Sequence, residues 1–337
     1  MEKQSVNQLS LVMPIHGSAP FLTAAISSIF ESRNVSIDLI LVLDRCTNSN
    51  LQELIQFAPT NIEVTVIHSL SPGIVPALNL GIANAKHDLI ARLDSDDLAD
   101  PDRFHQQVAY LTTFKEVVCL GTQMHFIDEF GNQFGYTNYP TRHLDIVRRM
   151  KYQNCIGHPS AMFRKSIFHQ VGGYREYLSG SEDYDLWIRM SEVGTLANLQ
   201  VKLTKYRSSQ FQVTNQIKLT QPTTDSACLI SAAMRRLNIP EIAPERNDLL
   251  FDYNRVNIRK VEAVNRAIAR EIKAAAHLNN AFREWAKEIS FKIKVLRTTQ
   301  ELFKAGFNKP SIILRFLVDR LWHRSVRVRL KGLKNDI

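Results

Sequence analysis

Short apolar runs alternate with segments of helical periodicity through the first hundred residues, and this alternation restricts the fold more than any other feature. Strands are predicted at residues 9–13, 38–43, 63–67 and 89–93. Helices are predicted between them at residues 21–32, 51–57 and 74–85. Such short-range alternation is typical of a mostly parallel sheet covered by helices. The sequence therefore predicts an α/β fold, in which Pro14 ends the first strand.

The chain continues with shorter and more varied elements. We predict helices at residues 103–114, 143–150 and 180–190, a strand at 117–122, a polar loop followed by a strand within 157–163, and a hairpin within 126–136. Past Ser208 the pattern becomes helical and rich in Lys and Arg, at residues 222–236, 248–276 and 281–302. Two regions follow from this change: an α/β domain over residues 8–215 and a basic helical region over residues 216–337.

The positive charge is concentrated near the end of the chain. The net charge is +9, yet residues 255–337 alone hold 20 Lys and Arg against 7 Asp and Glu. The preceding residues are therefore slightly acidic. This asymmetry predicts that the last part of the chain meets phosphate, on lipid or on nucleic acid, while the α/β domain does something else.

Acidic side chains follow two of the predicted strands. Asp44 comes directly after the second strand, and Asp94, Asp96 and Asp97 follow the fourth. In open α/β sheets these strand ends share one edge, where ligands bind. Carboxylates held together repel one another, and a divalent cation such as Mg²⁺ or Mn²⁺ removes that repulsion. The alternative is an acidic loop that caps the next helix through Asp97 or Asp100.

The sequence lacks the motifs that are typical of several other classes of protein. The first strand is not followed by a glycine-rich dinucleotide or P-loop motif. Four widely spaced cysteines indicate neither a zinc site nor a disulfide framework, which favours a reducing cytosol. Residues 1–10 lack the apolar segment of a signal peptide, and no window reaches the ~18 apolar residues of a membrane span.

Six short motifs occur in one order along residues 9–207. They are Val-Met-Pro at 12–14, Asp-Arg-Cys-Thr at 44–47, Ala-Leu-Asn-Leu-Gly at 77–81, Asp-Ser-Asp-Asp at 94–97, Gly-Gly-Tyr at 172–174 and Glu-Asp-Tyr-Asp-Leu-Trp at 182–187. This order and spacing resemble those of family 2 glycosyltransferases, which are inverting enzymes of the GT-A fold. The resemblance implies a mixed, mostly parallel Rossmann-like sheet and transfer of a sugar from a nucleotide-diphosphate donor.

The resemblance also implies roles for the donor side. Asp94 and Asp96 would hold Mn²⁺ or Mg²⁺, which assists departure of the diphosphate. The donor-binding residues implied are Pro14, Ile15, Asp44, Asn79, Arg92, Asp94, Ser95 and Arg207. For Arg92, contact with phosphate and structural pairing with the carboxylates both remain open. The family often places a histidine two residues after the arginine that matches Arg207; Ser209 stands there, which leaves a third metal ligand in doubt.

On the acceptor side, the resemblance places the catalytic base at Asp183. Such a base removes the proton of the acceptor hydroxyl as that oxygen attacks the anomeric carbon. The alternative for Glu182 and Asp183 is an acidic pair that offsets the dipole at a helix N-terminus. The acceptor-binding residues expected are His158, Gly173, Tyr174, Glu182 and Trp187.

The sequence also leads to expectations about the partners of the protein and its location in the cell. Besides the donor, we expect a saccharide or lipid-linked saccharide acceptor, from which surface polysaccharide or glycolipid is built, and no nucleic acid. Residues 312–330 form a basic amphipathic pattern, which suits either an anionic membrane surface or packing on the catalytic domain. The protein is expected in the cytoplasm, either free or peripheral at the inner face of the plasma membrane. Alternative functions are a sugar nucleotidyltransferase and a nucleic-acid-binding protein that uses the basic region.

Overall fold

The computed structural model describes residues 7–47, 50–150, 153–208, 228, 231 and 232. All of them belong to the first of two units, Met1–Phe251. The helices predicted at 248–276 and 281–302, most of the one at 222–236, and the basic stripe at 312–330 lie outside the described residues. Among the described residues, no helix has the length and apolar character needed to cross a bilayer.

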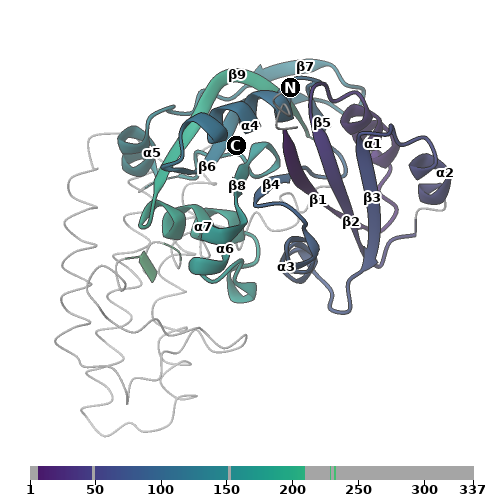
Figure 1. Ribbon diagram of the computed structural model, residues 1–337, viewed down its shortest axis with the longest axis horizontal. Coiled ribbons are helices and arrows are strands. Elements are labelled where there is room, and N and C mark those ends of the chain that lie inside the picture. The colour runs from purple at the N-terminus through teal and green to yellow at the C-terminus, as the bar shows by residue number, and fades with distance from the viewer. Residues whose placement is uncertain (1–6, 48–49, 151–152, 209–227, 229–230, 233–337) are drawn as a thin grey trace, which may run out of the picture. The chain divides into compact units, whose positions relative to one another are not determined.

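One nine-stranded sheet organises the described unit (Figure 1). Its first part has the strand order β3-β2-β1-β4, and all three pairings in it are parallel. The strands are β1 (Gln8–His16), β2 (Ser36–Asp44), β3 (Ile62–His68) and β4 (Leu89–Arg92). The helices between them are α1 (Leu22–Phe30), α2 (Leu51–Ile55) and α3 (Ile74–Asn84). The predicted α/β alternation is confirmed.

The sequence pattern predicted that the first strand ends at Pro14, and this prediction is wrong. β1 continues to His16 and stays paired with β2 along its whole length. The Val12 carbonyl accepts the Leu93 N–H, so Val12 turns its polar groups toward β4. Pro14 has the same orientation, two residues on, where β4 has already ended. The missing N–H of proline therefore removes no hydrogen bond from the sheet.

The second part of the sheet mixes orientations. β4 pairs antiparallel with β8, β8 antiparallel with β6, and β6 parallel with β9. These strands, with the edge strands β5 and β7, are β5 (Leu98–Ala99), β6 (Val117–Ile127), β7 (Gln133–Tyr136), β8 (Met162–Arg164) and β9 (Thr195–Arg207). The hairpin predicted within 126–136 is the β6–β7 pair. The sequence pattern did not predict β5 or β9.

Helices and two 3₁₀ turns complete the unit. They are α4 (Arg103–Thr113), α5 (His143–Arg149), η1 (His158–Ser160), α6 (Lys165–Gln170), η2 (Glu176–Leu178) and α7 (Glu182–Ser191). The polar loop predicted at the start of 157–163 forms the 3₁₀ turn η1, which contains Pro159, and the strand predicted after it is β8. A proline fixes its own φ near the helical value and lacks the N–H that a strand would use.

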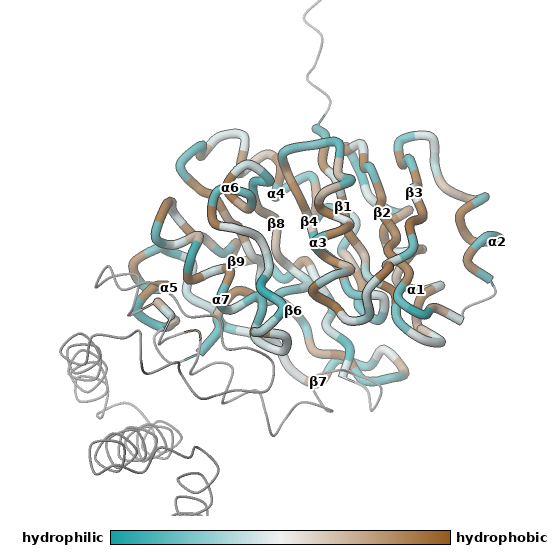
Figure 2. The backbone as a smooth tube through the Cα atoms, turned by 90° about the horizontal axis from the view of Figure 1, so that it is seen from below, coloured by the Kyte–Doolittle hydropathy of each residue, from teal (hydrophilic) through white to brown (hydrophobic). Residues whose placement is uncertain are grey.

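The core lies on both faces of the sheet, since alternate strand residues point to opposite sides. Leu11 and Met13 pack toward α1 and α4, whereas Val12 packs toward α3 and α7. The hydropathy colouring of Figure 2 follows this division, with a largely brown β2 between flanking helices. Gly81 lets α3 approach closely, because a Cβ there would lie 2.5 Å from a methyl carbon of Val12.

Candidate active site

The acidic loop, residues 93–97, joins β4 to β5 and is held at both ends. At its start the Leu93 N–H donates to the Val12 carbonyl, and inside it the Asp97 N–H donates to the Asp94 carbonyl. At its end β5 pairs antiparallel with β9. One carboxylate oxygen from each of Asp94, Asp96 and Asp97 lies within 4.8 Å of the others. The fold therefore brings together the acids that the sequence pattern singled out, with Ser95 between them.

Arg92 neutralises part of this charge. Its buried guanidinium forms an ion pair with both carboxylate oxygens of Asp94. Burial lowers the pKa of Arg92, but the charges of Asp94, Tyr174 and Asp97 and the hydrogen bond to Asp94 together outweigh it and raise that pKa. The structure shows Arg92 paired with Asp94, and contact of Arg92 with phosphate stays a prediction.

The pKa values of the other two carboxyl groups in the loop are raised. Burial and then the charge of Asp94 raise the pKa of Asp96 to about 6. Burial and the charges of Asp96 and Asp94 raise that of Asp97 well above its usual range. Oδ1 of Asp97 accepts the Arg207 N–H at 2.7 Å, while its buried Oδ2 has no hydrogen-bond partner in the described part of the chain. Clustered oxygen donors of this kind fit a hard divalent cation.

Arg207, at the end of β9, ties three segments together. Its Nε donates to the Asp96 carbonyl at 2.9 Å, and its Nη1 donates to the Asp128 and Glu129 carbonyls at 3.0 Å each. The guanidinium also lies over the Phe21 ring, 4.4 Å from its centroid. These contacts orient the acidic loop against the β6–β7 turn and the start of α1. Donor contact by Arg207 stays a prediction.

Asp44 ends β2 next to the end of β1, at the same edge as the acidic loop. Its Oδ2 accepts the Gly73 N–H at 2.9 Å and lies 3.1 Å from Nδ1 of His16, and its Oδ1 accepts from Nε of Arg45. Burial would raise the pKa of Asp44, but these hydrogen bonds outweigh it and hold that pKa below its usual value. Asp44 is therefore a fixed carboxylate. In the neighbouring strand Pro14 is half-buried and Ile15 fully buried.

Asp183 lies in the first turn of α7, and its side chain is held by two donors. Oδ2 accepts from Nδ2 of Asn154 at 2.7 Å, and Oδ1 accepts the Tyr184 N–H at 2.7 Å. Both bonds favour the ionised carboxylate that a general base requires. The preceding Glu182 is buried and accepts the Gly180 N–H at 2.6 Å. Burial raises the pKa of Glu182.

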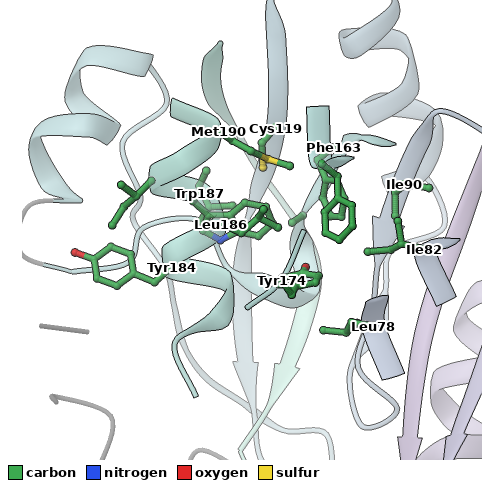
Figure 3. Close-up of a cluster of buried hydrophobic side chains, with 14 of the residues drawn as sticks. Leu78, Ile82, Ile90, Cys119, Phe163, Tyr174, Tyr184, Leu186, Trp187 and Met190 are labelled. Carbon is green, nitrogen blue, oxygen red and sulfur yellow. The ribbon is translucent and has the colours of Figure 1, made fainter. Parts of the chain in front are cut away.

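Behind Asp183 lies a buried aromatic layer. Nε2 of His158 is 2.8 Å from the hydroxyl oxygen of Tyr174, and its Nδ1 is 3.8 Å from Oε1 of Glu182. Trp187 packs edge-on against His158, with ring centroids 6.1 Å apart. Figure 3 shows Trp187 inside the apolar cluster, where it has no exposed surface. Trp187 is therefore a core residue, and its predicted part in acceptor binding stays a prediction.

Asn79 fixes the turn that carries Tyr174. Its Nδ2 donates to the Tyr174 carbonyl at 3.0 Å, and its Oδ1 accepts the Tyr174 N–H at 3.1 Å. Gly173 precedes Tyr174 with φ +66, a conformation that disfavours residues with a side chain. The carboxamide of Asn79 thus joins α3 to the 172–174 turn. Its predicted contact with the donor remains untested.

Arg92 links the acidic loop electrostatically to His158, Tyr174 and Glu182. Burial dominates the shifts nearby, lowering the pKa of His158 and raising those of Tyr174 and Glu182. The positive charge of Arg92 acts to lower the pKa of all three groups, so it adds to the shift of His158 and opposes the shifts of Tyr174 and Glu182. The charge of Asp94 also acts on Glu182. The fold therefore gathers motifs that lie about ninety residues apart in the chain into one site.

Two contributors were missed by the sequence reasoning. Asn154 orients the Asp183 carboxylate, yet it belongs to none of the motifs. Arg103 is fully buried at the start of α4, where Nη2 donates to the Arg92 carbonyl at 2.8 Å and Nε donates to Gln107. Burial lowers the pKa of Arg103 to about 9. Only the position of Arg103 just after the acidic loop hinted at a role.

Comparisons with known proteins show what the chain as a whole is similar to. Residues 10–172 match the family model described as "Glycosyl transferase family 2". The chain is 30% identical over 213 residues to the Escherichia coli "UDP-Gal:alpha-D-GlcNAc-diphosphoundecaprenol beta-1,3-galactosyltransferase", covering 60% of this chain and 75% of that protein. It is 28% identical over 191 residues to the Escherichia coli "O-antigen biosynthesis glycosyltransferase WbnJ", covering 56% of this chain and 74% of that protein.

The fold also resembles a solved structure. The crystal structure of S. aureus TarS 1–349 in complex with UDP-GlcNAc superimposes with a TM-score of 0.57 at 14% sequence identity. The match covers 79% of this chain and 81% of that one. At this identity the likeness concerns the fold alone, and it supports the predicted GT-A architecture.

Proposed function

Because this chain belongs to glycosyl transferase family 2 and is a glycosyltransferase, we propose that it transfers a sugar with inversion from a nucleotide-diphosphate donor to an acceptor hydroxyl, with the help of a divalent cation. The observation that carries the proposal is a three-carboxylate loop paired with Arg92, together with the oriented Asp183 carboxylate beside Glu182, on which Arg92 and Asp94 both act. The carboxylates of the acidic loop would serve the leaving diphosphate, and Asp183 would serve the incoming hydroxyl.

The donor half of the proposal rests on the strand ends. A cation bound at Asp96, with Asp94 beside it, would neutralise charge on the diphosphate as it leaves. Asp44 is ionised and held by three donors, which suits it to accept a hydrogen bond from a nucleobase N–H. Pro14 and Ile15 lie in β1 beside it and would form the apolar wall of the nucleoside pocket.

The acceptor half rests on α7. Asp183 would accept the proton of the acceptor hydroxyl while that oxygen attacks the anomeric carbon on the face opposite the diphosphate. Asn154 and the Tyr184 N–H hold the carboxylate in one orientation for this transfer. His158, Gly173, Tyr174 and Glu182 would shape the surface on which the acceptor lies.

The substitution Asp183→Asn tests the base. The amide keeps the shape of the side chain but accepts no proton, so transfer should fall by a factor of about 10² or more. Nucleotide-sugar affinity, measured by calorimetry, should stay within about twofold. Glu192→Gln, at the exposed end of the same helix, is the matched control and should keep its turnover. Retained turnover in Asp183→Asn would remove Asp183 as base, and a product with retained anomeric configuration, by NMR, would refute inversion.

The substitution Asp96→Asn tests the cation. In the parent protein, Mn²⁺ should tighten nucleotide-sugar binding, and in Asp96→Asn this increment should disappear. Asp145→Asn, on the exposed surface of α5, serves as the control for loss of one negative charge. Equal nucleotide affinity with and without Mn²⁺ in the parent protein would refute the cation.

For the acceptor, we propose a lipid-linked saccharide used in building a surface polysaccharide. Two relatives support this: one is named for a diphosphoundecaprenol-linked sugar, and the other for O-antigen biosynthesis. A cytoplasmic location, peripheral at the inner face of the membrane, fits such an acceptor. A panel of nucleotide sugars tested against GlcNAc-diphospholipid and against free GlcNAc would show whether the lipid diphosphate is required.

A further inference from the structure

The β6–β7 hairpin carries large aromatic side chains to the surface. Its turn is rigid, because Oδ1 of Asp128 accepts the N–H groups of Phe130 and Asn132 at 2.9 and 2.8 Å. Phe130 stands on this turn with 89% of its surface exposed. Figures 1 and 2 both place β7 at the margin of the described residues. An apolar ring this exposed on an ordered turn has no role in the core.

Two more exposed rings follow Phe130 on β7. Phe134 and Tyr136 are each 63% exposed. Phe134 stacks on Phe126 with ring centroids 6.0 Å apart, and Tyr206 of β9 meets Phe126 edge-on at 6.0 Å. Phe126 therefore holds Phe134 in place, and Tyr136 lies two residues farther along the same strand. Large exposed rings gathered on one ordered hairpin are typical of an interaction surface.

Lysines of β9 border these rings. Nζ of Lys202 lies over the Tyr136 ring, 4.7 Å from its centroid. Lys205 pairs in register with His125, which in turn pairs with Tyr136. The pKa of His125 is lowered by burial and by the positive charges of Lys202 and Lys205. Both lysines are exposed, so the rim of the patch is positive.

The patch is joined to the active site through one side chain. The Arg207 guanidinium donates to the Asp128 and Glu129 carbonyls in the hairpin turn and to the Asp96 carbonyl in the acidic loop. Phe130 follows Glu129 directly. Whatever the hairpin contacts is therefore held at a fixed position beside the acidic loop.

We propose that the aromatic hairpin surface, formed by Phe130, Phe134, Tyr136, Lys202 and Lys205, docks on an anionic lipid bilayer. Aromatic rings bury apolar area at the lipid headgroup level. Each lysine near an anionic leaflet adds attraction, so the charge of the rim is complementary to such a surface. The rings project from a turn and do not enclose a hollow, which suits a broad surface better than one sugar ring.

This docking surface goes beyond the proposed transfer reaction and does not depend on it. It is also separate from the basic stripe at residues 312–330, which lies outside the described residues. An enzyme seated on the hairpin would present its acidic loop next to the headgroups. Soluble acceptors would gain nothing from this placement, whereas acceptors anchored in the bilayer would meet the site directly.

Vesicle flotation of the full chain tests the proposal. The parent protein should float with vesicles containing 30% phosphatidylglycerol in phosphatidylcholine. Phe130→Ser combined with Phe134→Ser, and separately Lys202→Gln combined with Lys205→Gln, should each weaken binding by about tenfold. The matched control is Phe57→Ser combined with Lys115→Gln, which removes an exposed phenylalanine and an exposed lysine elsewhere. This control should bind as the parent does.

A second measurement reports on the hairpin itself, whatever the rest of the chain contributes to binding. Phe130→Trp places a fluorophore at the turn, and brominated phosphatidylcholine should quench its added emission. The Phe57→Trp variant should show no added quenching.

Three outcomes would overturn the proposal. The first is unchanged flotation of both double variants, and the second is absence of added quenching in Phe130→Trp. The third is loss of affinity for a soluble saccharide with vesicle binding intact in the phenylalanine variant, because the rings would then bind sugar. Thermal unfolding of each variant separates misfolding from lost docking.

Discussion

Replacement of Arg207 by methionine tests whether the Arg207 side chain holds the acidic loop in place. Methionine keeps much of the apolar length of the side chain but removes the guanidinium. The donors to the carbonyls of Asp96, Asp128 and Glu129 are lost, together with the contact over the Phe21 ring. The backbone N–H of residue 207 still reaches Asp97, so the register of β9 against the loop should persist.

The magnitude follows from these contacts. Each hydrogen bond contributes about 0.5–1.5 kcal/mol net, and a cation–π contact about 0.5–1 kcal/mol. Water can replace part of the loss at the exposed hairpin turn. We therefore expect the free energy of unfolding to fall by about 2–4 kcal/mol. Because the Asp96 carbonyl is no longer fixed, affinity for Mn²⁺ should also fall, by about tenfold.

Urea unfolding and Mn²⁺ calorimetry give the two readouts, and Arg164→Met is the matched control. Arg164 also donates to backbone carbonyls, those of Val117 and Leu111, but away from the acidic loop. The control should lose stability and keep its Mn²⁺ affinity. Equal Mn²⁺ affinity in parent and Arg207→Met would refute the role assigned to Arg207.

Three further perturbations have defined outcomes. The pKa of Asp96 is raised to about 6, so its protonation should lower Mn²⁺ affinity about tenfold per pH unit below 6. The same raised pKa should make the metal-free protein more stable as pH falls from 6 to 4. Calorimetry with Mn²⁺ and urea unfolding, each at pH 5 and 7, check the two directions. Gly81→Ala forces a methyl against Val12 and should cost about 1–3 kcal/mol in urea unfolding. Arg189→Met removes the guanidinium that is bonded at 2.9 Å to the buried Asp185 carboxylate, which then keeps only the ion pair with Arg175 at 3.6 Å. The free energy of unfolding should fall by about 3–5 kcal/mol, and a loss below 1 kcal/mol would contradict this role of Arg189.

The parallel half of the sheet could be predicted from sequence because its signals are local. Each buried strand is a short apolar run, and each is followed within a few residues by a polar strand end. Asp44 and Asp94 fall at such ends, so their shared edge followed from topology before any contact was known. The role of Asp183 came instead from the order of motifs, since an acid at a helix N-terminus is common for electrostatic reasons alone.

The antiparallel half could not be predicted in the same way. β9 mixes exposed lysines with buried residues, and its pairing with β5 joins segments about a hundred residues apart. No local pattern announces a two-residue strand such as β5. The buried charge of Arg103 was equally hidden, because two of its partners are the backbone carbonyls of Arg92 and Ala161, and carbonyls exist at every position. Asn154 was hidden for another reason: its partner Asp183 lies 29 residues farther along the chain.

The anchoring of residues 93–97 between two strands of one sheet has a consequence for the lifetime of the protein. Carboxylates on a free loop would separate until their repulsion vanished, but here β4 and β5 hold them together. The folded chain thus keeps a repulsion between carboxylates that the proposed divalent cation would relieve. A cation at a hundred times its dissociation constant would add about 2.7 kcal/mol to stability. The cation supply of the cell would then set how long the enzyme persists, as well as how fast it works.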